Sequence, residues 1–350
     1  MKKKKNKLIN GYKQREYHPI KLFLKKKNYT TLEESLKVPN DIFNVNISKE
    51  MKIYKTKIKD YKCISIPGTD IFGKTKINQD SYYSFINIYN LNNYSVFAVF
   101  DGHGINGHYV SKFVKNYFQN FFENICKTNN NDDIDENLIY KELKREDIIK
   151  EKFKLIENFL LEKNFSIQYS GTTCIIIIHI EDKLICYNLG DSRAVYINKD
   201  FKCIQISKDH KPELPKEKMR IEENGGIVKK DYSNYGVYRV WSKTGKYPGL
   251  AMSRSIGDYV AKSLGVIDEP DFYQVNIIEN KISAVIISSD GLWNILNNYQ
   301  IKKIVEEYII KNDCIGCINA LVEEAKKMYI KKNIIRDDIT IIVIFFELKN

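Results

Sequence analysis

Aspartates stand at the ends of five apolar, strand-like runs in this sequence. The run VFAVF stops at Asp101 and AVIISS stops at Asp290, while Asp191 follows ICYNLG. Asp80 and Asp337 come just before the runs SYYSFI and ITIIVIFF. A carboxylate beside a dry core is costly unless it is paired or binds a cation. A single case would indicate a turn residue that caps its own backbone. Five cases predict that neighbouring strand ends meet in one acidic pocket.

Such a pocket favours hydrolysis of phosphoesters. Oxygen ligands bind Mg²⁺ or Mn²⁺ in preference to zinc. Two ions that share an aspartate, about 3.5–4 Å apart, deprotonate a bridging water, which attacks phosphorus in line with the leaving oxygen. Gly102 has no Cβ, so its backbone carbonyl could approach a metal. His103 follows it, and an imidazole, which titrates near neutrality, suits protonation of the leaving alkoxide.

Eight segments carry a resemblance to a known family. In chain order they are FGKTKINQD, VFAVFDGHG, SGTTCIII, NLGDSRAVY, KDHKPELPKEKMRIEENGG, LAMSRSIGDY, IISSDGLWNIL and RDDITIIVI. Together they make the chain, from about residue 60 to residue 347, resemble the metal-dependent protein phosphatases of type 2C. The resemblance implies hydrolysis of phosphoserine and phosphothreonine in proteins. It also implies a pair of antiparallel β-sheets flanked by helix pairs, with a dimetal site at one end.

The resemblance gives each aspartate of the motifs a role. Asp101 matches the aspartate that bridges both metals, and Gly102 matches the residue whose backbone carbonyl binds the second metal. Asp290 and Asp337 match the other ligands of the first metal. Asp80 matches an aspartate that holds metal-bound water. The implied cofactor is therefore Mg²⁺ or Mn²⁺, with two ions in each catalytic site.

Further positions follow from the same resemblance. His103 matches the proposed general acid. Asp191 matches a ligand of a weaker third metal, and Asp258 matches a carboxylate near it. Residues 211–250 would form the variable flap beside the active site. Phosphorylated proteins would be the substrates.

Three positions depart from the family pattern. Gln79 stands where the family often has Glu, so one negative charge is lost at the second metal and weaker binding is expected there. Thr75 stands where the family often has an arginine that holds the substrate phosphate. Lys74 or Lys76 could supply a point charge instead, without the bidentate fork of arginine. Asn294 replaces an aspartate, which leaves binding of a third metal open.

The order of hydrophobic patterns predicts an α+β fold. Strand-like runs are KIYKTKI, KCISIP, DSYYSFINIY and YSVFAVF, and then TCIIIIHI, KLICYNLG and AVYINKD after two amphipathic helices over residues 109–126 and 138–164. A short helix over 214–226 and an irregular stretch over 227–265 follow. The strands ISAVIISSDG and DDITIIVIFFEL enclose two more helices. This order indicates a central two-sheet antiparallel β-sandwich flanked by helix pairs, in α-β-β-α layers.

The net charge of +12 is concentrated at the N-terminus. Residues 1–30 hold eleven Lys and Arg against one Glu, that is +10, which leaves +2 for the other 320 residues. We expect residues 1–50 to be a basic, partly disordered extension that could contact anionic surfaces. Residues 51–350 would be a single catalytic domain. Because the charge is confined to the extension and no nucleic-acid motif is legible, specific nucleic-acid binding is not predicted.

The sequence also bears on location. No apolar run approaches 18 residues and no apolar region follows the lysine-rich start, so neither a transmembrane segment nor a secretory signal is predicted. Seven scattered cysteines fit a reducing compartment. Cys314 and Cys317 lack the second pair of ligands that a zinc site needs. We expect a monomer inside the cell, in the cytoplasm, the nucleus or both.

Two other functions share features with this sequence. Calcineurin-like metallophosphoesterases also place D-x-H after a strand, as Asp101 and His103 do, but they need an Asn-His-Asp/Glu motif that this sequence lacks. The second alternative is a catalytically weak or inactive relative that binds phosphoproteins as a regulator. The substitutions at Gln79, Thr75 and Asn294 keep that alternative open. The aspartates of the first metal are all retained, so we predict an active metal-dependent protein serine/threonine phosphatase.

Overall fold

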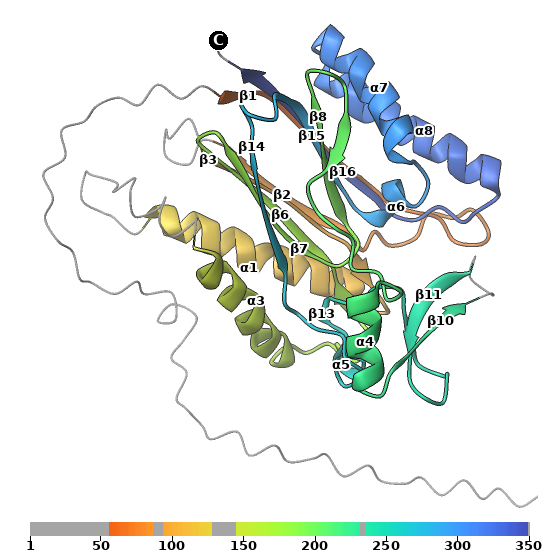
Figure 1. Cartoon of the computed structure of the whole chain (residues 1–350). Coiled ribbons are helices and arrows are strands. Elements are labelled where there is room, and N and C mark those ends of the chain that lie inside the picture. Colours follow the sequence, from red (N-terminus) through yellow and green to blue (C-terminus); the bar gives the residue numbers. More distant parts are fainter. Residues whose placement is uncertain (1–55, 87–93, 128–144, 232–235, 349–350) are drawn as a thin grey trace, which may run out of the picture. The chain divides into compact units, whose positions relative to one another are not determined.

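The computed structural model describes residues 56–86, 94–127, 145–231 and 236–348 (Figure 1). All of these residues belong to one compact unit. The basic extension predicted for residues 1–50 lies outside the described residues. That prediction and the boundary of the catalytic domain therefore stay predictions.

Two five-stranded sheets form the centre of the compact unit. The first contains, in spatial order, β1 (Thr56–Ile66), β16 (Ile339–Leu348), β15 (Ile282–Ser288), β8 (Arg193–Asn198) and β9 (Cys203–Gln205). The second contains β14 (Asp271–Asn276), β7 (Lys183–Leu189), β6 (Cys174–Ile180), β3 (Tyr94–Phe100) and β2 (Ser81–Ile86). Neighbouring strands in both sheets run antiparallel.

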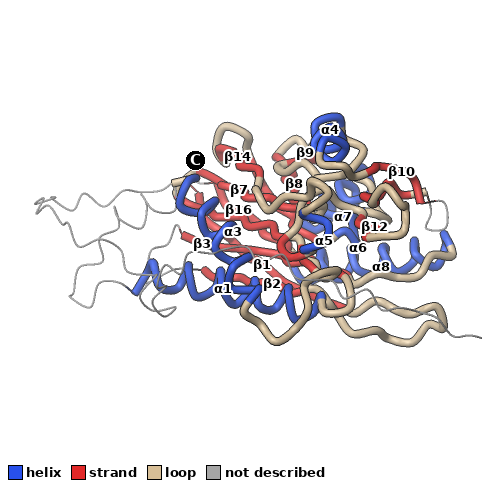
Figure 2. Tube along the Cα trace, turned by 90° about the horizontal axis from the view of Figure 1, so that it is seen from below, coloured by secondary structure: helices blue, strands red, loops and turns tan. Residues whose placement is uncertain are grey.

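A pair of helices covers the outer face of each sheet (Figures 1 and 2). Helices α1 (Gly107–Lys127) and α3 (Glu146–Leu161) pack on the second sheet through a cluster that includes Phe118 and Phe153. Helices α7 (Asn298–Lys311) and α8 (Cys314–Lys332) pack on the first sheet. The inner faces of the two sheets bury a third cluster, which includes Phe97, Ile175 and Ile342. The layers are α-β-β-α, as the sequence predicts.

Polar residues set the ends of the second helix pair. Helix α7 starts with a capping box between Asn297 and Gln300. It ends at Asn312, whose left-handed backbone (φ 54°) stops the helix. The next residue, Asp313, caps the first turn of α8, and Asn333 ends that helix with φ 52°. The sharp turn between α7 and α8 thus follows from two adjacent residues, and it allows the two helices to pack side by side.

The structure corrects the predicted strands in three places. The described end of KIYKTKI (residues 56–58) and the run KCISI belong to one strand, β1, because the polar break at Asp60 is a register shift inside a continuous ladder. The stretch predicted to be irregular contains a small sheet of β10 (Ile227–Asp231), β11 (Val237–Trp241) and β12 (Pro248–Leu250). Strand β14 was not predicted, because it is a half-buried edge strand with no long apolar run.

The small sheet and the helix before it lie in the predicted flap. Helix α4 (Pro215–Glu223) starts at a proline, as expected from the sequence. Its residue Ile221 packs with Val228 and Val240 of the small sheet in a separate core cluster. Only one face of these short strands is apolar, so their signal in the sequence is weak. Of the helix predicted over residues 138–164, the part 146–161 is described as α3.

Strand pairing brings the acidic strand ends to one end of the sandwich. Ser81 of β2 pairs with Phe100 of β3, so the aspartates just outside both residues are neighbours. Ser288 of β15 pairs with Ile341 of β16 and, on its other side, with Arg193 of β8. The fold therefore gathers aspartates that are up to 257 positions apart in the sequence, from Asp80 to Asp337.

The contact between the sheets predicts a large effect of one substitution. Phe97 is fully buried there, and the ring of Tyr61 meets it edge-on with centroids 5.4 Å apart. Phe97→Ala should lower the free energy of unfolding by about 3–5 kcal/mol, because apolar contacts are lost and a cavity remains. Urea denaturation measures the change. Phe72→Ala, at a side chain 79% exposed, is the control and should change it by about 0.5 kcal/mol or less. Similar values for both would contradict this packing.

Candidate active site

Five aspartates converge at one end of the sandwich, and we call them the acidic cluster: Asp80, Asp101, Asp191, Asp290 and Asp337. Hydrogen bonds join the two sheets at this point. The Ser289 hydroxyl donates to Asp80 Oδ2 at 2.8 Å, and the amide of Asp290 donates to Asp101 Oδ2 at 3.4 Å. The cluster therefore spans both sheets and contains the predicted metal ligands.

The cluster carries an unfavourable density of negative charge. Burial raises the pKa of Asp101 well above its usual value, and the nearby charges of Asp80 and Asp290 raise it further. Burial and neighbouring carboxylates also raise the pKa of Asp80 to about 7 and that of Asp290 to about 8. Carboxylates in this condition gain stability when a cation binds between them.

Two lysines place their ammonium groups against the cluster. Lys76 Nζ lies 2.7 Å from Asp337 Oδ1, and Lys211 Nζ lies 2.5 Å from Asp191 Oδ2. Burial alone would lower the pKa of Lys76, but the charge of Asp337 outweighs this effect and raises it. The ammonium therefore stays charged and neutralises part of the cluster.

The donor set fits a hard divalent cation. All five side chains offer carboxylate oxygens, the ligands that Mg²⁺ and Mn²⁺ prefer. Oδ1 of Asp80 and Oδ1 of Asp191 are buried and have no hydrogen-bond partner among the described residues. Within the described ranges, no three Asp, Glu, His or Cys side chains already enclose an ion site. Binding would therefore draw the carboxylates together at the expense of the lysine contacts.

The chain at Gly102 has no room for a side chain. A Cβ there would lie 2.4 Å from the carbonyl oxygen of Gln79 and 2.5 Å from that of Gly107. The amide of Gly102 donates to the same Gln79 carbonyl at 3.2 Å. The Gln79 side chain in turn donates to the carbonyl of Gly104 at 2.7 Å. Gln79 thus braces the loop after Asp101, in addition to standing at the position predicted for the second metal.

His103 and Asp258 form a close pair beside the cluster. His103 Nε2 lies 2.6 Å from Asp258 Oδ2, which also accepts the Ser255 hydroxyl at 2.6 Å. Burial alone would lower the pKa of His103, but Asp258 outweighs it and raises the pKa. Nδ1 of His103 is buried without a hydrogen-bond partner in the described part of the chain. A Cβ on Gly171 would lie 2.3 Å from Asp258 Oδ2, so this pair depends on a glycine opposite it.

The two candidate phosphate-binding lysines differ in position. Lys76 reaches the cluster at Asp337, whereas Lys74 is exposed and makes no ion pair in the described structure. Thr75, between them, is also exposed. Asn294 Nδ2 donates to Asp290 Oδ2 at 2.8 Å, so the amide binds a cluster carboxylate where the resemblance would place another carboxylate.

Three site residues were not found from the sequence. Asp338 accepts the amides of Gly68 (2.6 Å) and Gln79 (2.9 Å), and it thereby holds the chain that leads to Asp80. Ser289 and Lys211 contact cluster aspartates directly. The doubled aspartate before β16 was a usable signal for Asp338. The contacts of Ser289 and Lys211 have no such signal, because they join segments far apart in the chain.

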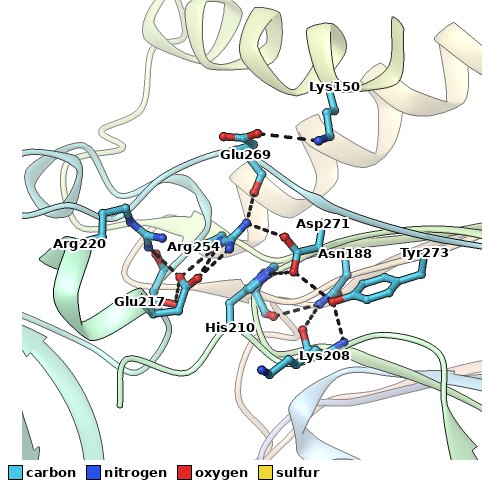
Figure 3. A network of polar contacts seen from close by, with 12 residues as sticks. Lys150, Asn188, Lys208, His210, Glu217, Arg220, Arg254, Glu269, Asp271 and Tyr273 are labelled. Carbon is cyan, nitrogen blue, oxygen red and sulfur yellow. Dashed lines mark hydrogen bonds and ion pairs between the residues drawn. The ribbon is translucent and has the colours of Figure 1, made fainter. Parts of the chain in front are cut away.

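Arg254 connects the flap helix to the edge of the second sheet (Figure 3). Its guanidinium donates to Glu217 of α4 at 2.7 Å and to Asp271 of β14 at 2.9 Å. Asp271 lies 3.2 Å from His210 Nε2, and His210 Nδ1 accepts the amide of Gly190 at 3.0 Å. This network fixes the turn that carries Asp191 and the segment that carries Lys211.

Two other histidines and the paired cysteines have structural surroundings. His179 is buried in β6, its ring meets that of Phe346, and burial lowers its pKa to about 4. His210 belongs to the network of Arg254. Cys314 and Cys317 belong to the first turn of α8 and are buried against the first sheet. These positions agree with structural roles for His179, His210 and the two cysteines.

Comparison with known proteins identifies the family. The family model described as "Protein phosphatase 2C" matches residues 76–334, which is most of the chain. This chain belongs to the protein phosphatase 2C family. "Probable protein phosphatase 2C 72" of Arabidopsis thaliana is 32% identical over 290 residues, which cover 81% of this chain and 85% of that protein. "Protein phosphatase 1L" of Bos taurus is 30% identical over 254 residues, which cover 72% and 66%.

Solved structures show the same fold. A serine-threonine phosphatase 2C from Toxoplasma gondii aligns with a TM-score of 0.66 at 22% identity, over 85% of this chain and 96% of that one. The serine/threonine phosphatase Stp1 of Staphylococcus aureus aligns with a TM-score of 0.53 at 19% identity, over 86% and 100%. The predicted α+β fold is confirmed.

Membership of the protein phosphatase 2C family confirms two predictions made from the sequence. These are the family itself and the activity of a serine/threonine phosphoprotein phosphatase. The family depends on Mg²⁺ or Mn²⁺, in agreement with the oxygen donors of the acidic cluster. Phosphorylated proteins are accordingly its substrates. None of the described helices is long and apolar enough to span a membrane.

The ion pair of Lys76 predicts competition with the metal. Lys76→Met removes the ammonium from Asp337 and should lower the Mn²⁺ concentration for half-saturation about fivefold, since such an ion pair contributes about 1 kcal/mol. Isothermal titration calorimetry with Mn²⁺ measures it. Lys74→Met is the matched control, because it loses the same charge at an exposed position and should leave the affinity nearly unchanged. Unchanged or weaker binding by the Lys76 variant would contradict the competition.

Proposed function

We propose that this chain releases phosphate from phosphoserine and phosphothreonine in proteins at the acidic cluster, with two Mg²⁺ or Mn²⁺ ions bound there. One observation carries the proposal. Five strands of two sheets bring their acidic ends together, where burial and mutual repulsion raise the pKa of Asp101, Asp80 and Asp290. A cation bound among these carboxylates would relieve that repulsion.

Each member of the cluster has a place in this proposal. Asp101, whose carboxylate interacts with all the others, would bind both ions. Asp290 and Asp337 would complete the first site, and Asp80 and the Gly102 carbonyl would complete the second. Bound ions would activate a water for in-line attack on phosphorus and neutralise the phosphate oxygens. Asp191 would hold a third ion. Binding there would be weaker, because Lys211 and Asn294 occupy positions where a further negative charge would strengthen it.

His103 would donate the proton to the leaving oxygen of the substrate. Its bond to Asp258 through Nε2 orients the ring and favours the charged form. Nδ1 then carries a proton that no described residue binds, and this is the proton that His103 would donate. Asp258 acts as a positioning residue, through its contact with the imidazole. Lys76 is the better placed of the two lysines to meet the phosphate.

Removal of single carboxylates tests the proposal. Asp101→Asn and Asp290→Asn should lower Mn²⁺-dependent phosphate release from a phosphoserine peptide by at least about 100-fold, because each removes an ion ligand. Asp200→Asn, in an exposed turn, is the matched control and should keep full activity. Release without added metal, or full activity in both cluster variants, would contradict the mechanism. A native chain that binds the peptide without releasing phosphate would be the inactive regulator.

The role of His103 predicts a dependence on the leaving group. His103→Gln should lower kcat for a phosphoserine peptide by about 100-fold or more, since its alkoxide needs a proton. Hydrolysis of p-nitrophenyl phosphate should fall far less, because nitrophenolate leaves without one. Steady-state kinetics on both substrates gives the comparison, and circular dichroism checks that the variant is folded. Equal losses on the two substrates would rule out proton donation by His103.

A further inference from the structure

Residues 68–76 form an arm that projects beside the acidic cluster. In Figure 1 the arm belongs to the orange loop between β1 and β2, which extends past α6 (Asp290–Trp293) on the same side as the small sheet of the flap. The arm contains no element of the two central sheets. Its sequence, GTDIFGKTK, places an isoleucine and a phenylalanine at its tip.

The tip of the arm is held in one conformation by its own backbone and by Asp70. Asp70 Oδ1 accepts the amides of Phe72 at 2.8 Å and Lys74 at 2.9 Å. The amide of Asp70 donates to the carbonyl of Lys74 at 2.8 Å. Thr69 and Thr75 form a β-bridge directly below. The turn is therefore closed without any contribution from the two apolar side chains.

The base of the arm is fixed to the catalytic end of the sandwich. Asp338 accepts the amide of Gly68 at 2.6 Å on one side and that of Gln79 at 2.9 Å on the other. Lys76 binds Asp337 at 2.7 Å. Both sides of the arm are thus tied to the two aspartates before β16, one of which is a predicted metal ligand. The arm and the acidic cluster keep a fixed relative position.

The tip presents its apolar side chains to water. Ile71 is 72% exposed and Phe72 is 79% exposed. Single exposed apolar residues are common on protein surfaces. Two large ones side by side on a braced turn are different, because neither takes part in closing the turn and a polar residue would serve there equally well. Exposed apolar groups of this kind mark sites of interaction.

We propose that Ile71 and Phe72 bind apolar residues of the phosphoprotein substrate, to one side of its phosphorylated residue. This rests on the proposed function. The substrate is the occupant because the arm is continuous with the active site through Lys76 and Asp338. Phe72 is four positions from Lys76, so the tip lies within about 14 Å of chain from the lysine that contacts the cluster. An extended substrate therefore passes the tip about four to six residues from its phosphate.

Charge near the tip supports the same occupant. Lys74 is exposed beside Phe72, and Lys76 lies between the tip and the cluster. A phosphorylated segment carries negative charge, so the lysines attract it along the side of the arm that leads to the carboxylates. Apolar contact at the tip would then select among phosphorylated segments.

A pair of peptides tests this selection. Both carry one phosphoserine and equal charge, but one has leucines and the other serines four to six residues from it on each side. With Mn²⁺ present, the native chain should hydrolyse the leucine peptide with kcat/KM about tenfold higher. In Ile71→Ser/Phe72→Ser this ratio should fall to about one. Ile71→Val/Phe72→Leu should keep most of the preference, because the tip stays apolar.

A matched control separates docking from a general loss of surface hydrophobicity. Ile310→Ser removes an isoleucine that is 69% exposed near the end of α7, on the helix pair above the first sheet. Its ratio for the two peptides should equal that of the native chain. Hydrolysis of p-nitrophenyl phosphate, which is too small to reach the tip, is the reference for each protein.

Four results would overturn the proposal. The first is equal hydrolysis of the two peptides by the native chain, and the second is an unchanged ratio in Ile71→Ser/Phe72→Ser. The third is an unchanged peptide ratio in that variant together with a shift from dimer to monomer in sedimentation, because the tip would then bind a second copy of this chain. The fourth is loss of binding to phosphatidylcholine vesicles with an unchanged ratio. Failure of the native chain to hydrolyse p-nitrophenyl phosphate with Mn²⁺ would contradict the proposed function itself. That result is independent of the ratio between the two peptides.

Discussion

Electrostatic repulsion among buried carboxylates has to be offset by the contacts of the surrounding fold. Two antiparallel sheets end in aspartates at the same edge, where burial and proximity raise the pKa of Asp101, Asp80 and Asp290. The ammonium groups of Lys76 and Lys211 offset part of this charge. The free-energy cost of this repulsion is confined to one end of the sandwich. The rest of the core must offset it, and three apolar clusters fill the layers behind that end.

Residues around the cluster limit how its members can move. Asp338 ties the chain before Asp80 to the start of β16, and Ser289 ties Asp80 to the end of β15. The network of Arg254 does the same for the turn that carries Asp191. Because these contacts join separate segments, the carboxylates are held near one another even though they repel. Cations can then bind with little further ordering of the backbone.

The sequence predicted the α-β-β-α layers and the phosphatase family better than it predicted individual side-chain contacts. Apolar periodicity placed the central strands and helices, because each buries one continuous face. It missed β14 and the small sheet at 227–250, where strands are short and only half apolar. Motif spacing located Asp80, Asp101, Asp290 and Asp337 as candidate ligands. It could not choose between Lys74 and Lys76, or find Lys211 on Asp191, because those contacts follow from side-chain reach across the folded chain.

The positions of bound cations are the decisive measurement for this site. Anomalous diffraction from crystals grown with Mn²⁺ locates them without reference to activity. We expect one peak between Asp101 and the pair Asp290 and Asp337, and another beside Asp101 toward Asp80 and Gly102, with Lys76 displaced from Asp337. Peaks elsewhere on the chain, or none among these carboxylates at saturating Mn²⁺, would contradict this expectation.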